Sequence, residues 1–148
     1  MFRFLILISL LLVSLEANSK KDGLAYLNTI RDQAGLIKFK TNKALEKAAL
    51  SHAKYLIHNQ TKSHYEKRGK PAFTGTTPSK RVVKAGYPTA YVMENLSINT
   101  KGYRQSIESI FSAIYHRFAF LSFDKDVIGF GHVLSNKKRK VKRSYVYN

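Results

Sequence analysis

Histidine and carboxylate side chains are the groups through which this chain could perform acid–base or metal chemistry. Its 148 residues include five His and nine Asp plus Glu, but no Cys. Without cysteine the chain has no thiolate nucleophile, no disulfide framework and no Cys-ligated zinc or iron–sulfur site. Any catalytic or metal site must therefore be built from these few histidines and acids.

Two of the histidines stand where burial alone would not select an imidazole. His64 lies in a polar segment, and His116 is flanked by large apolar residues. On one unbroken helix His116 would lie about 180° from Ile107, so either the helix breaks before it or a polar face lines a cleft. Glu94 ends an extended apolar run, where a buried carboxylate needs a partner. A site shared by His64, Glu94 and His116 is therefore one hypothesis.

The other three histidines have simpler interpretations. His52 falls on the apolar stripe of a predicted helix, which favours a hydrogen-bonded core histidine. His58 lies near the end of that helix, where a cation interacts favourably with the helix dipole, so we interpret it as structural. His132 lies in a predicted strand and could face either way, so we assign it no role.

Helices and a terminal hairpin must position these residues. Apolar periodicity, Asn and Thr caps, and a Pro-first, Gly-last pattern predict four helices. Period-two alternation predicts two strands joined by a basic loop. We expect helices over Asp22–Ala34 and Asn42–His58, from Pro78 to just before Gly86 and from about Tyr103 through Ile114, with strands over Val127–Leu134 and Ser144–Tyr147. This order predicts a layered α+β domain.

The N-terminus indicates export. A short basic start precedes an apolar run from Phe4 to Leu15, and the small residue Ala17 then leads into a polar stretch. This is the pattern of a secretory signal peptide, here residues 1–17, and the apolar run is short for a bilayer span. The alternative is an uncleaved membrane anchor. We therefore expect a secreted or periplasmic protein with one domain over residues 20–148, which ends inside a predicted strand as though truncated.

The charge predicts an anionic partner. There are 26 Lys plus Arg, and the formal net charge is +17. Six of the seven residues from Lys137 to Arg143 are basic, and 17 − 6 leaves +11 without them. That run is either a solvated hairpin loop or a binding motif. Nucleic acid would suit this charge in the cytosol, but an exported protein meets anionic lipid and cell-wall polymer instead.

The order of several short motifs resembles the bacterial, cysteine-free members of the CAP superfamily (cysteine-rich secretory, antigen 5 and pathogenesis-related proteins), whose domains are also called SCP-like. The resemblance covers about residues 24–147. It rests on the segments Leu27–Leu36, Asn42–His58, Ser63-His64, Arg81 with Ala85-Gly86-Tyr87, Glu94-Asn95-Leu96, His116-Arg117 and Ile128-Gly129-Phe130-Gly131. Met93 stands where the family usually has Gly.

The resemblance implies a fold and a site. The fold would be an α-β-α sandwich around a three-stranded antiparallel sheet. The cleft of the family holds two His and two acids, which places His64, Glu94 and His116 there as putative metal ligands. The family's Trp-x-x-Glu element is absent, and Glu108, the acid in the fourth predicted helix, is the candidate for the fourth position. Such a donor set suits zinc or another divalent metal.

Two functions from different classes follow from this resemblance. The first is a secreted, non-enzymatic binding module at the cell envelope, whose cleft holds a divalent metal or a small ligand, including an apolar ligand or lipid. The second is a metal-assisted hydrolase that acts on peptide or cell-wall material through the same cleft. Because one fold hosts many functions, the resemblance leaves open whether the protein is an enzyme.

Overall fold

The computed structural model describes residues 19–148, so the predicted signal peptide, residues 1–17, lies outside the described residues. The described chain begins with a helix over residues 19–33. The elements that follow are β1 (Lys40–Thr41), α2 (Lys43–Asn59), α3 (Pro78–Lys84), β2 (Asn95–Ile98), α4 (Gly102–Phe111), α5 (Ile114–Leu121), β3 (Val127–Ile128), β4 (Phe130–Leu134) and β5 (Arg143–Tyr147).

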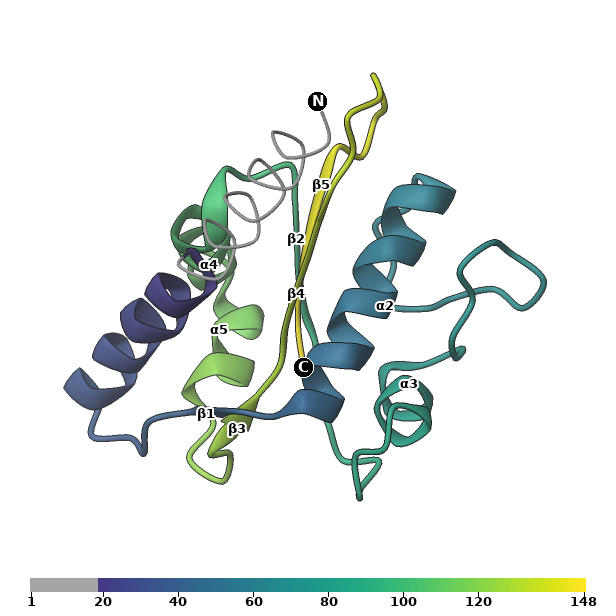
Figure 1. Ribbon diagram of the computed structural model, residues 1–148. Coiled ribbons are helices and arrows are strands. Elements are labelled where there is room, and N and C mark those ends of the chain that lie inside the picture. The colour runs from purple at the N-terminus through teal and green to yellow at the C-terminus, as the bar shows by residue number, and fades with distance from the viewer. Residues whose placement is uncertain (1–18) are drawn as a thin grey trace, which may run out of the picture.

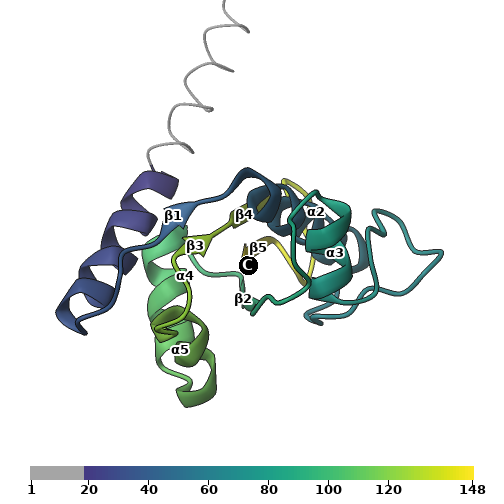
Figure 2. The same cartoon turned by 90° about the horizontal axis from the view of Figure 1, so that it is seen from below.

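The elements form three layers. Strand β5 lies between β2 and β4 and is antiparallel to both, while β1 and β3 form a separate short parallel pair. The helix over residues 19–33, α4 and α5 lie on one side of the three-stranded sheet, and α2 and α3 lie on the other (Figures 1 and 2). The expected α-β-α sandwich with a three-stranded antiparallel sheet is confirmed.

Helix α2 shows why local sequence predicts these elements well. The Asn42 side chain accepts hydrogen bonds from the backbone N–H groups of Ala44 and Leu45, which otherwise have no partner within the helix. At the other end, Gln60 adopts a left-handed conformation with φ 54° and terminates the helix. The apolar stripe that predicted the helix is buried throughout: Leu45, Ala48, Ala49, His52 and Leu56.

Aromatic side chains fill the sheet face that the helix over residues 19–33, α4 and α5 cover. Phe130, Tyr145 and Tyr147 alternate along β4 and β5 and pack around Tyr103 of α4. The centroid of the Tyr103 ring lies 5.5, 5.2 and 6.3 Å from those of the three rings, in edge-to-face geometry. This apolar cluster also includes Leu27, Phe39, Ile107, Ile110, Phe120 and Ile128.

On the opposite face of the sheet, an apolar cluster that includes Ala53, Leu56 and Val146 is buried, and the α2 main chain also approaches the sheet closely. A Cβ atom added at Gly131 would lie 2.2 Å from the carbonyl carbon of Ala49, and one at Gly129 would lie 2.2 Å from that of Leu45. Both contacted atoms belong to the α2 main chain. Glycine is therefore required at these two positions for α2 to lie against β4, because any side chain there would push the helix off the sheet.

The fourth predicted helix breaks before His116. Helix α4 ends at Phe111, and Ala113 has the extended conformation φ −98°, ψ 117° before α5 begins at Ile114. The first of the two alternatives raised by the position of His116 is therefore the correct one. The predicted strand Val127–Leu134 also divides, at Gly129, whose backbone N–H and C=O both pair with Asn148.

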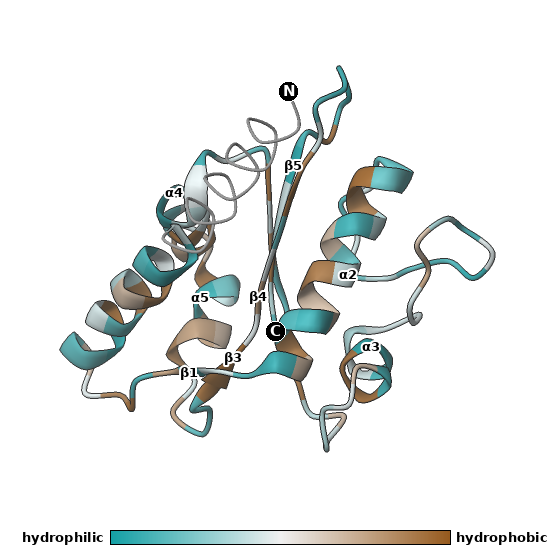
Figure 3. Cartoon of the chain, in the orientation of Figure 1, coloured by the Kyte–Doolittle hydropathy of each residue, from teal (hydrophilic) through white to brown (hydrophobic). Residues whose placement is uncertain are grey.

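The basic loop joins β4 and β5 as the hairpin connection that its sequence predicts, and it is strongly hydrophilic (Figure 3). Over residues 19–148, none of the helices combines the length and the apolar composition that crossing a bilayer requires.

Candidate functional site

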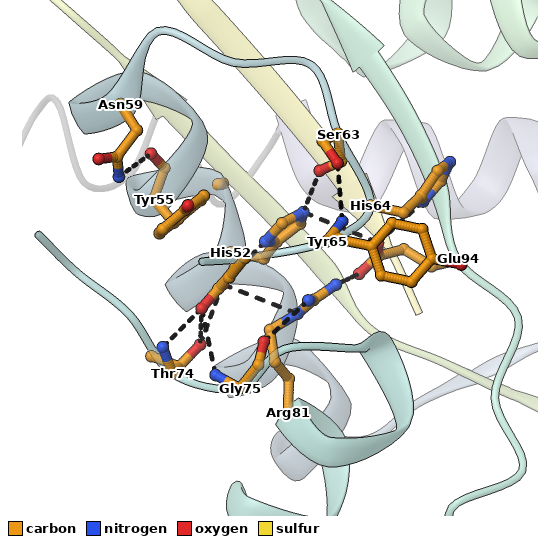
Figure 4. Close-up of polar contacts among 12 residues, drawn as sticks. His52, Tyr55, Asn59, Ser63, His64, Tyr65, Thr74, Gly75, Arg81 and Glu94 are labelled. Atoms are coloured by element: carbon orange, nitrogen blue, oxygen red, sulfur yellow. Dashed lines mark hydrogen bonds and ion pairs between the residues drawn. The ribbon is translucent and has the colours of Figure 1, made fainter. Parts of the chain in front are cut away.

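Five ionisable side chains meet between α2, α3 and the start of β2 (Figure 4). We call them the ionic cluster. One comes from α2, one from α3, two from the loop between these helices, and one from the residue before β2. In chain order they are His52, His64, Glu66, Arg81 and Glu94.

Glu94 is the acceptor at the centre of the cluster, with a side chain that is 1% exposed. The Nδ1 atom of His64 lies 2.9 Å from Oε1 of Glu94, and Nη2 of Arg81 donates to Oε2 at 2.6 Å. In the orientation that satisfies its amide, Asn148 also donates to Oε2, at 2.9 Å. The sequence-based expectation that Glu94 needs a partner is confirmed, and both of its oxygens are engaged.

Glu66 closes the loop that carries His64. Its carboxylate accepts hydrogen bonds from the backbone N–H groups of Thr74 and Gly75 and contacts Nδ1 of His52 at 2.9 Å. Burial raises the pKa of Glu66, but the hydrogen bonds from His52, Thr74 and Gly75 and the charge of Arg81 together bring that pKa below its ordinary value. Glu66 is therefore a buried carboxylate that stays ionised and organises the loop.

His52 lies between two acceptors. Its second ring nitrogen, Nε2, lies 3.1 Å from the carbonyl oxygen of Ser63, and Nδ1 faces the carboxylate of Glu66. The side chain is fully buried, so these two contacts hold the loop that carries His64 and Glu66 against α2.

Arg81 joins the two acids. Helix α3 presents it one turn from its start, where Pro78 follows the N-cap Thr77. The guanidinium is buried, and besides its bond to Glu94 it donates from Nη1 to the carbonyl oxygen of Gly75 at 3.3 Å. Its Nε atom lies 3.8 Å from Oε1 of Glu66. One arginine therefore links α3 to both buried carboxylates.

His64 is the open member of the cluster, with a side chain that is 38% exposed. Because the carboxylate of Glu94 accepts a hydrogen bond, Nδ1 of His64 is the protonated nitrogen, and Nε2 is the nitrogen with a free lone pair when the ring is neutral. The arrangement can therefore offer one oriented imidazole to a ligand, a proton or a metal ion.

Neither of the other two predicted metal ligands joins this pair in a group that could hold a metal ion, within residues 19–148. His116 is an exposed residue of α5, and its backbone carbonyl accepts a hydrogen bond from the Asn95 side chain. Glu108 lies on α4, across the sheet from α2 and α3, where Arg104 and the Tyr26 hydroxyl donate to it. Within the described range, residues 19–148, no group of three His, Asp or Glu side chains could hold a metal ion.

The contacts of Glu94 indicate whether its carboxylate could bind a metal ion beside His64. A carboxylate that fixes Nδ1 of a histidine typically orients that histidine as a ligand and does not itself bind the metal. The guanidinium of Arg81 at Oε2 also opposes a divalent cation there, because like charges repel. The donor set His64, Glu94 and His116 does not fit a three-ligand zinc site in this arrangement, and zinc binding stays a prediction.

Sequence reasoning missed Glu66 and Arg81 as members of the site. The signal for Arg81 was its place in the family motif from Arg81 to Tyr87, and that for Glu66 its place two residues after His64. The composition of α3, in which Val82 and Val83 stand among polar and basic residues, does not mark Arg81 as buried. The interpretation of His52 as a hydrogen-bonded core histidine is confirmed. His58 is exposed in the last turn of α2, and His132 packs against the ring of Tyr145.

An apolar pocket adjoins the ionic cluster. It is lined by Asn148, which also bonds Glu94, and by side chains from the segment before β2, from α5 and from β3. The apolar members of the lining include Tyr87, Tyr91, Val92, Met93, Ala119, Phe120, Val127 and Ile128. Asn148 therefore lies at the boundary between the ionic cluster and the pocket.

Comparison with known protein families gives one match. The model of the CAP family, described as the cysteine-rich secretory protein family, matches residues 24–147. Comparison with curated proteins gives no match.

Solved structures with the same fold include three bacterial proteins. An outer surface protein from Borrelia burgdorferi is 21% identical, with a TM-score of 0.74 over 88% of this chain and 90% of that one. An extracellular protein containing a SCP domain from Bacillus anthracis str. Ames is 17% identical, with a TM-score of 0.72 over 89% of this chain and 40% of its own. A cysteine-rich secretory protein from Staphylococcus aureus subsp. aureus Mu50 is 18% identical, with a TM-score of 0.63 over 89% of this chain and 39% of its own. These likenesses concern the fold, and the chain spans about two fifths of the last two proteins.

Proposed function

The chain belongs to the cysteine-rich secretory protein (CAP) family, and from that premise we propose that it is an exported, non-enzymatic binding module held at anionic parts of the cell envelope by a basic surface. Export is supported by the apolar N-terminal run and by neighbours that are described as an outer surface protein and an extracellular protein. The single observation that carries the proposal is the uneven distribution of acidic side chains, which leaves one surface strongly positive.

Acidic side chains are distributed unevenly over the molecule. Between residues 47 and 107 the acids are Glu66 and Glu94, and both side chains are buried in the ionic cluster. After Asp126 the sequence contains no acid. The surface formed by these parts of the chain therefore carries many more cations than carboxylates, although Arg104 pairs with Glu108.

Three segments of this region are tied together. Arg139 donates to the carbonyl oxygen of Ile57 near the end of α2, and Gln60 exchanges two hydrogen bonds with Val141 of the hairpin. The α2–α3 loop is fixed to α2 through the hydroxyl of Tyr55. The exposed cations that these segments carry, which we call the basic surface, are Lys54, Lys62, Lys67, Arg68, Lys70, Lys137, Lys138, Lys140 and Lys142.

Binding through this surface should depend strongly on salt and on the hairpin. Exposed charges are screened within about 8 Å at physiological ionic strength, so sedimentation with anionic vesicles or cell-wall polymer should fall steeply as salt rises. Replacing Lys137, Lys138 and Lys140 together by Gln should weaken binding by about tenfold or more without abolishing it, since the other cations remain.

A charge-matched variant controls for net charge. Replacing Lys21, Lys38 and Lys40 by Gln removes the same charge from exposed positions outside the basic surface. Under the proposal this variant keeps nearly all of its binding. Equal losses in the two variants would show that only net charge matters, and binding that is indifferent to salt would contradict the proposal.

The ionic cluster and the adjoining apolar pocket supply the ligand-binding part of the proposal. The open edge of His64 suits a small polar group, and the pocket beside Asn148 suits an apolar one. Zinc titration by calorimetry tests the hydrolase alternative, which needs a metal. Stoichiometric zinc binding that is lost when His64 and His116 are both replaced by Ala would favour that alternative, whereas weak binding unchanged in this variant supports the non-enzymatic function.

A further inference from the structure

Helix α5 turns an apolar face away from the protein. Tyr115 is 83% exposed, Ile114 62% and Phe118 55%, whereas Phe120 is 1% exposed and packs in the aromatic cluster. At about 100° per residue, the three exposed side chains lie within about 100° of one another on the helix surface. Phe120 lies on the opposite side. The exposed residues therefore form one continuous face and are not scattered.

The apolar surface continues past the helix. Phe123 follows α5 and is 84% exposed. Tyr91 and Met93 are also exposed and line the same pocket as Ala119 of α5. We call Ile114, Tyr115, Phe118 and Phe123 the α5 patch. Contiguous exposed apolar side chains of this kind mark interaction surfaces, whereas single ones are ordinary.

The α5 patch is held outward by specific contacts. Buried Arg31 donates to the carbonyl oxygens of Phe120, Ser122 and Lys125 at 2.6, 3.1 and 2.8 Å, which fixes the C-terminal end of the helix. Asn95 holds the first turn through the carbonyl oxygen of His116. The outward orientation is therefore part of the fold.

Two cations lie near the α5 patch. Arg117 lies on the helix itself, and Nζ of Lys125 lies 3.7 Å from the centroid of the Tyr91 ring and 2.7 Å from Oδ2 of Asp124, with which it forms an ion pair. Attraction to an anionic surface therefore comes mainly from the net charge of the whole chain. Two copies of a chain with a net charge of +17 would repel one another across a shared apolar face, whereas an anionic bilayer attracts the same chain. Aromatic side chains with adjacent cations are also typical of the membrane–water interface.

We propose that the α5 patch docks on an anionic lipid bilayer, with Tyr115 and Phe118 entering the interface. The inference rests on the proposed association with the envelope, names lipid as the partner and adds a second contact surface to it. Attraction of the net positive charge brings the protein to the bilayer, and the apolar side chains of α5 then bury surface that is exposed to water in the free protein.

The absence of tryptophan from the sequence permits a local test. Tyr115→Trp places a single reporter in the α5 patch, and Val83→Trp places one at an exposed position of α3, outside both the α5 patch and the basic surface. Each protein, as secreted, is mixed with vesicles of phosphatidylcholine alone or with added phosphatidylglycerol. With the anionic vesicles, the Tyr115→Trp emission should shift to shorter wavelength and be quenched by brominated acyl chains, and the Val83→Trp emission should do neither.

Removal of the apolar side chains gives the second measurement. Replacing Phe118 and Phe123 together by Ser should weaken partition into anionic vesicles by about tenfold or more, because each apolar side chain contributes to interfacial binding. Val83→Ser, at an exposed apolar position of α3 across the sheet from α5, is the matched control and should change partition by less than about twofold. Because all three side chains are exposed, thermal unfolding should be nearly unchanged.

The failures of this inference and of the proposed function are distinguishable. Co-sedimentation with anionic vesicles but an unshifted Tyr115→Trp emission would overturn docking through α5 and leave the basic surface as the contact. A shift of equal size on phosphatidylcholine alone would overturn the requirement for anionic lipid. Self-association in the absence of vesicles that is lost on replacing Phe118 by Ser would assign the patch to a second copy. Loss of all binding to anionic material would contradict the proposed function itself.

Discussion

The two faces of the central sheet differ in the contacts that pack them, although apolar side chains are buried on both. Toward α4 and α5, alternate residues of β4 and β5 present aromatic rings such as Phe130 and Tyr147, which fill space with side chains. Toward α2, the same strand β4 presents Gly131, and the helix main chain lies directly against it. Beyond that contact, the layer of α2 and α3 holds the buried charges of the ionic cluster.

This difference indicates how well each face should tolerate substitutions. Side-chain packing tolerates volume-conserving changes at a moderate cost, because neighbouring side chains can shift. A main-chain contact and a group of paired buried charges do not tolerate a conservative change in the same way, since neither a backbone clash nor an unpaired charge can be relieved locally. The α2 face therefore fixes the geometry around His64.

The largest expected effect is at Gly131. Gly131→Ala would place a Cβ atom 2.2 Å from the carbonyl carbon of Ala49, so the helix must move or the chain cannot fold. We expect a loss of about 5 kcal/mol or more in the free energy of unfolding, beyond ordinary overpacking. Urea unfolding measures the effect, and Leu134→Ala, at an exposed position of the same strand, should cost less than about 1 kcal/mol. A stable Gly131→Ala protein would contradict the close approach of α2.

Removal of the buried cation should come next. Arg81→Met leaves Glu94 and Glu66 buried with one cation fewer, and breaking such a group by removing one partner costs about 3–5 kcal/mol. Phe120→Ala in the aromatic cluster should cost a similar amount, about 3–5 kcal/mol. The two variants should differ in their effect on neighbouring segments. Arg81→Met should also loosen the loop around His64 and increase its amide hydrogen exchange, whereas Phe120→Ala should not. An unchanged exchange rate in that loop would remove the organising role of the cluster.

The smallest effect is the pH dependence of the ionic cluster. The pKa of Glu66 in the folded protein lies below its ordinary value of 4.5, so between these two values the unfolded chain binds the extra proton. The stability that Glu66 contributes is therefore fully present above about pH 4.5 and is lost as the pH falls through the lowered value. Glu66→Gln should flatten the acid limb of a plot of unfolding free energy against pH, and Phe120→Ala should leave its slope unchanged. An equal slope in Glu66→Gln would contradict the assignment.

Part of the site could be predicted from the sequence. Glu94 was identified because a carboxylate after an apolar run needs a partner, and His64 because it lies in a polar segment. The structure pairs His64 with Glu94 across 30 residues. It also pairs Glu94 with Arg81 across 13 residues, which the sequence analysis did not predict. His116 is grouped with them both by spacing and by the family resemblance. Helix α5, which carries it, follows a break in the helix that periodicity allowed without requiring.

Local sequence determined the helices, the hairpin, the net charge and the order of the family motifs, because apolar periodicity, caps and turn residues act over a few positions. The tertiary structure alone decided which cation neutralises each buried acid, how closely α2 approaches β4, and that α5 exposes its aromatic side chains. Each of these depends on segments that are distant in the chain and adjacent in space. Their contacts come from packing and from pairing of buried charge, neither of which leaves a local period in the sequence.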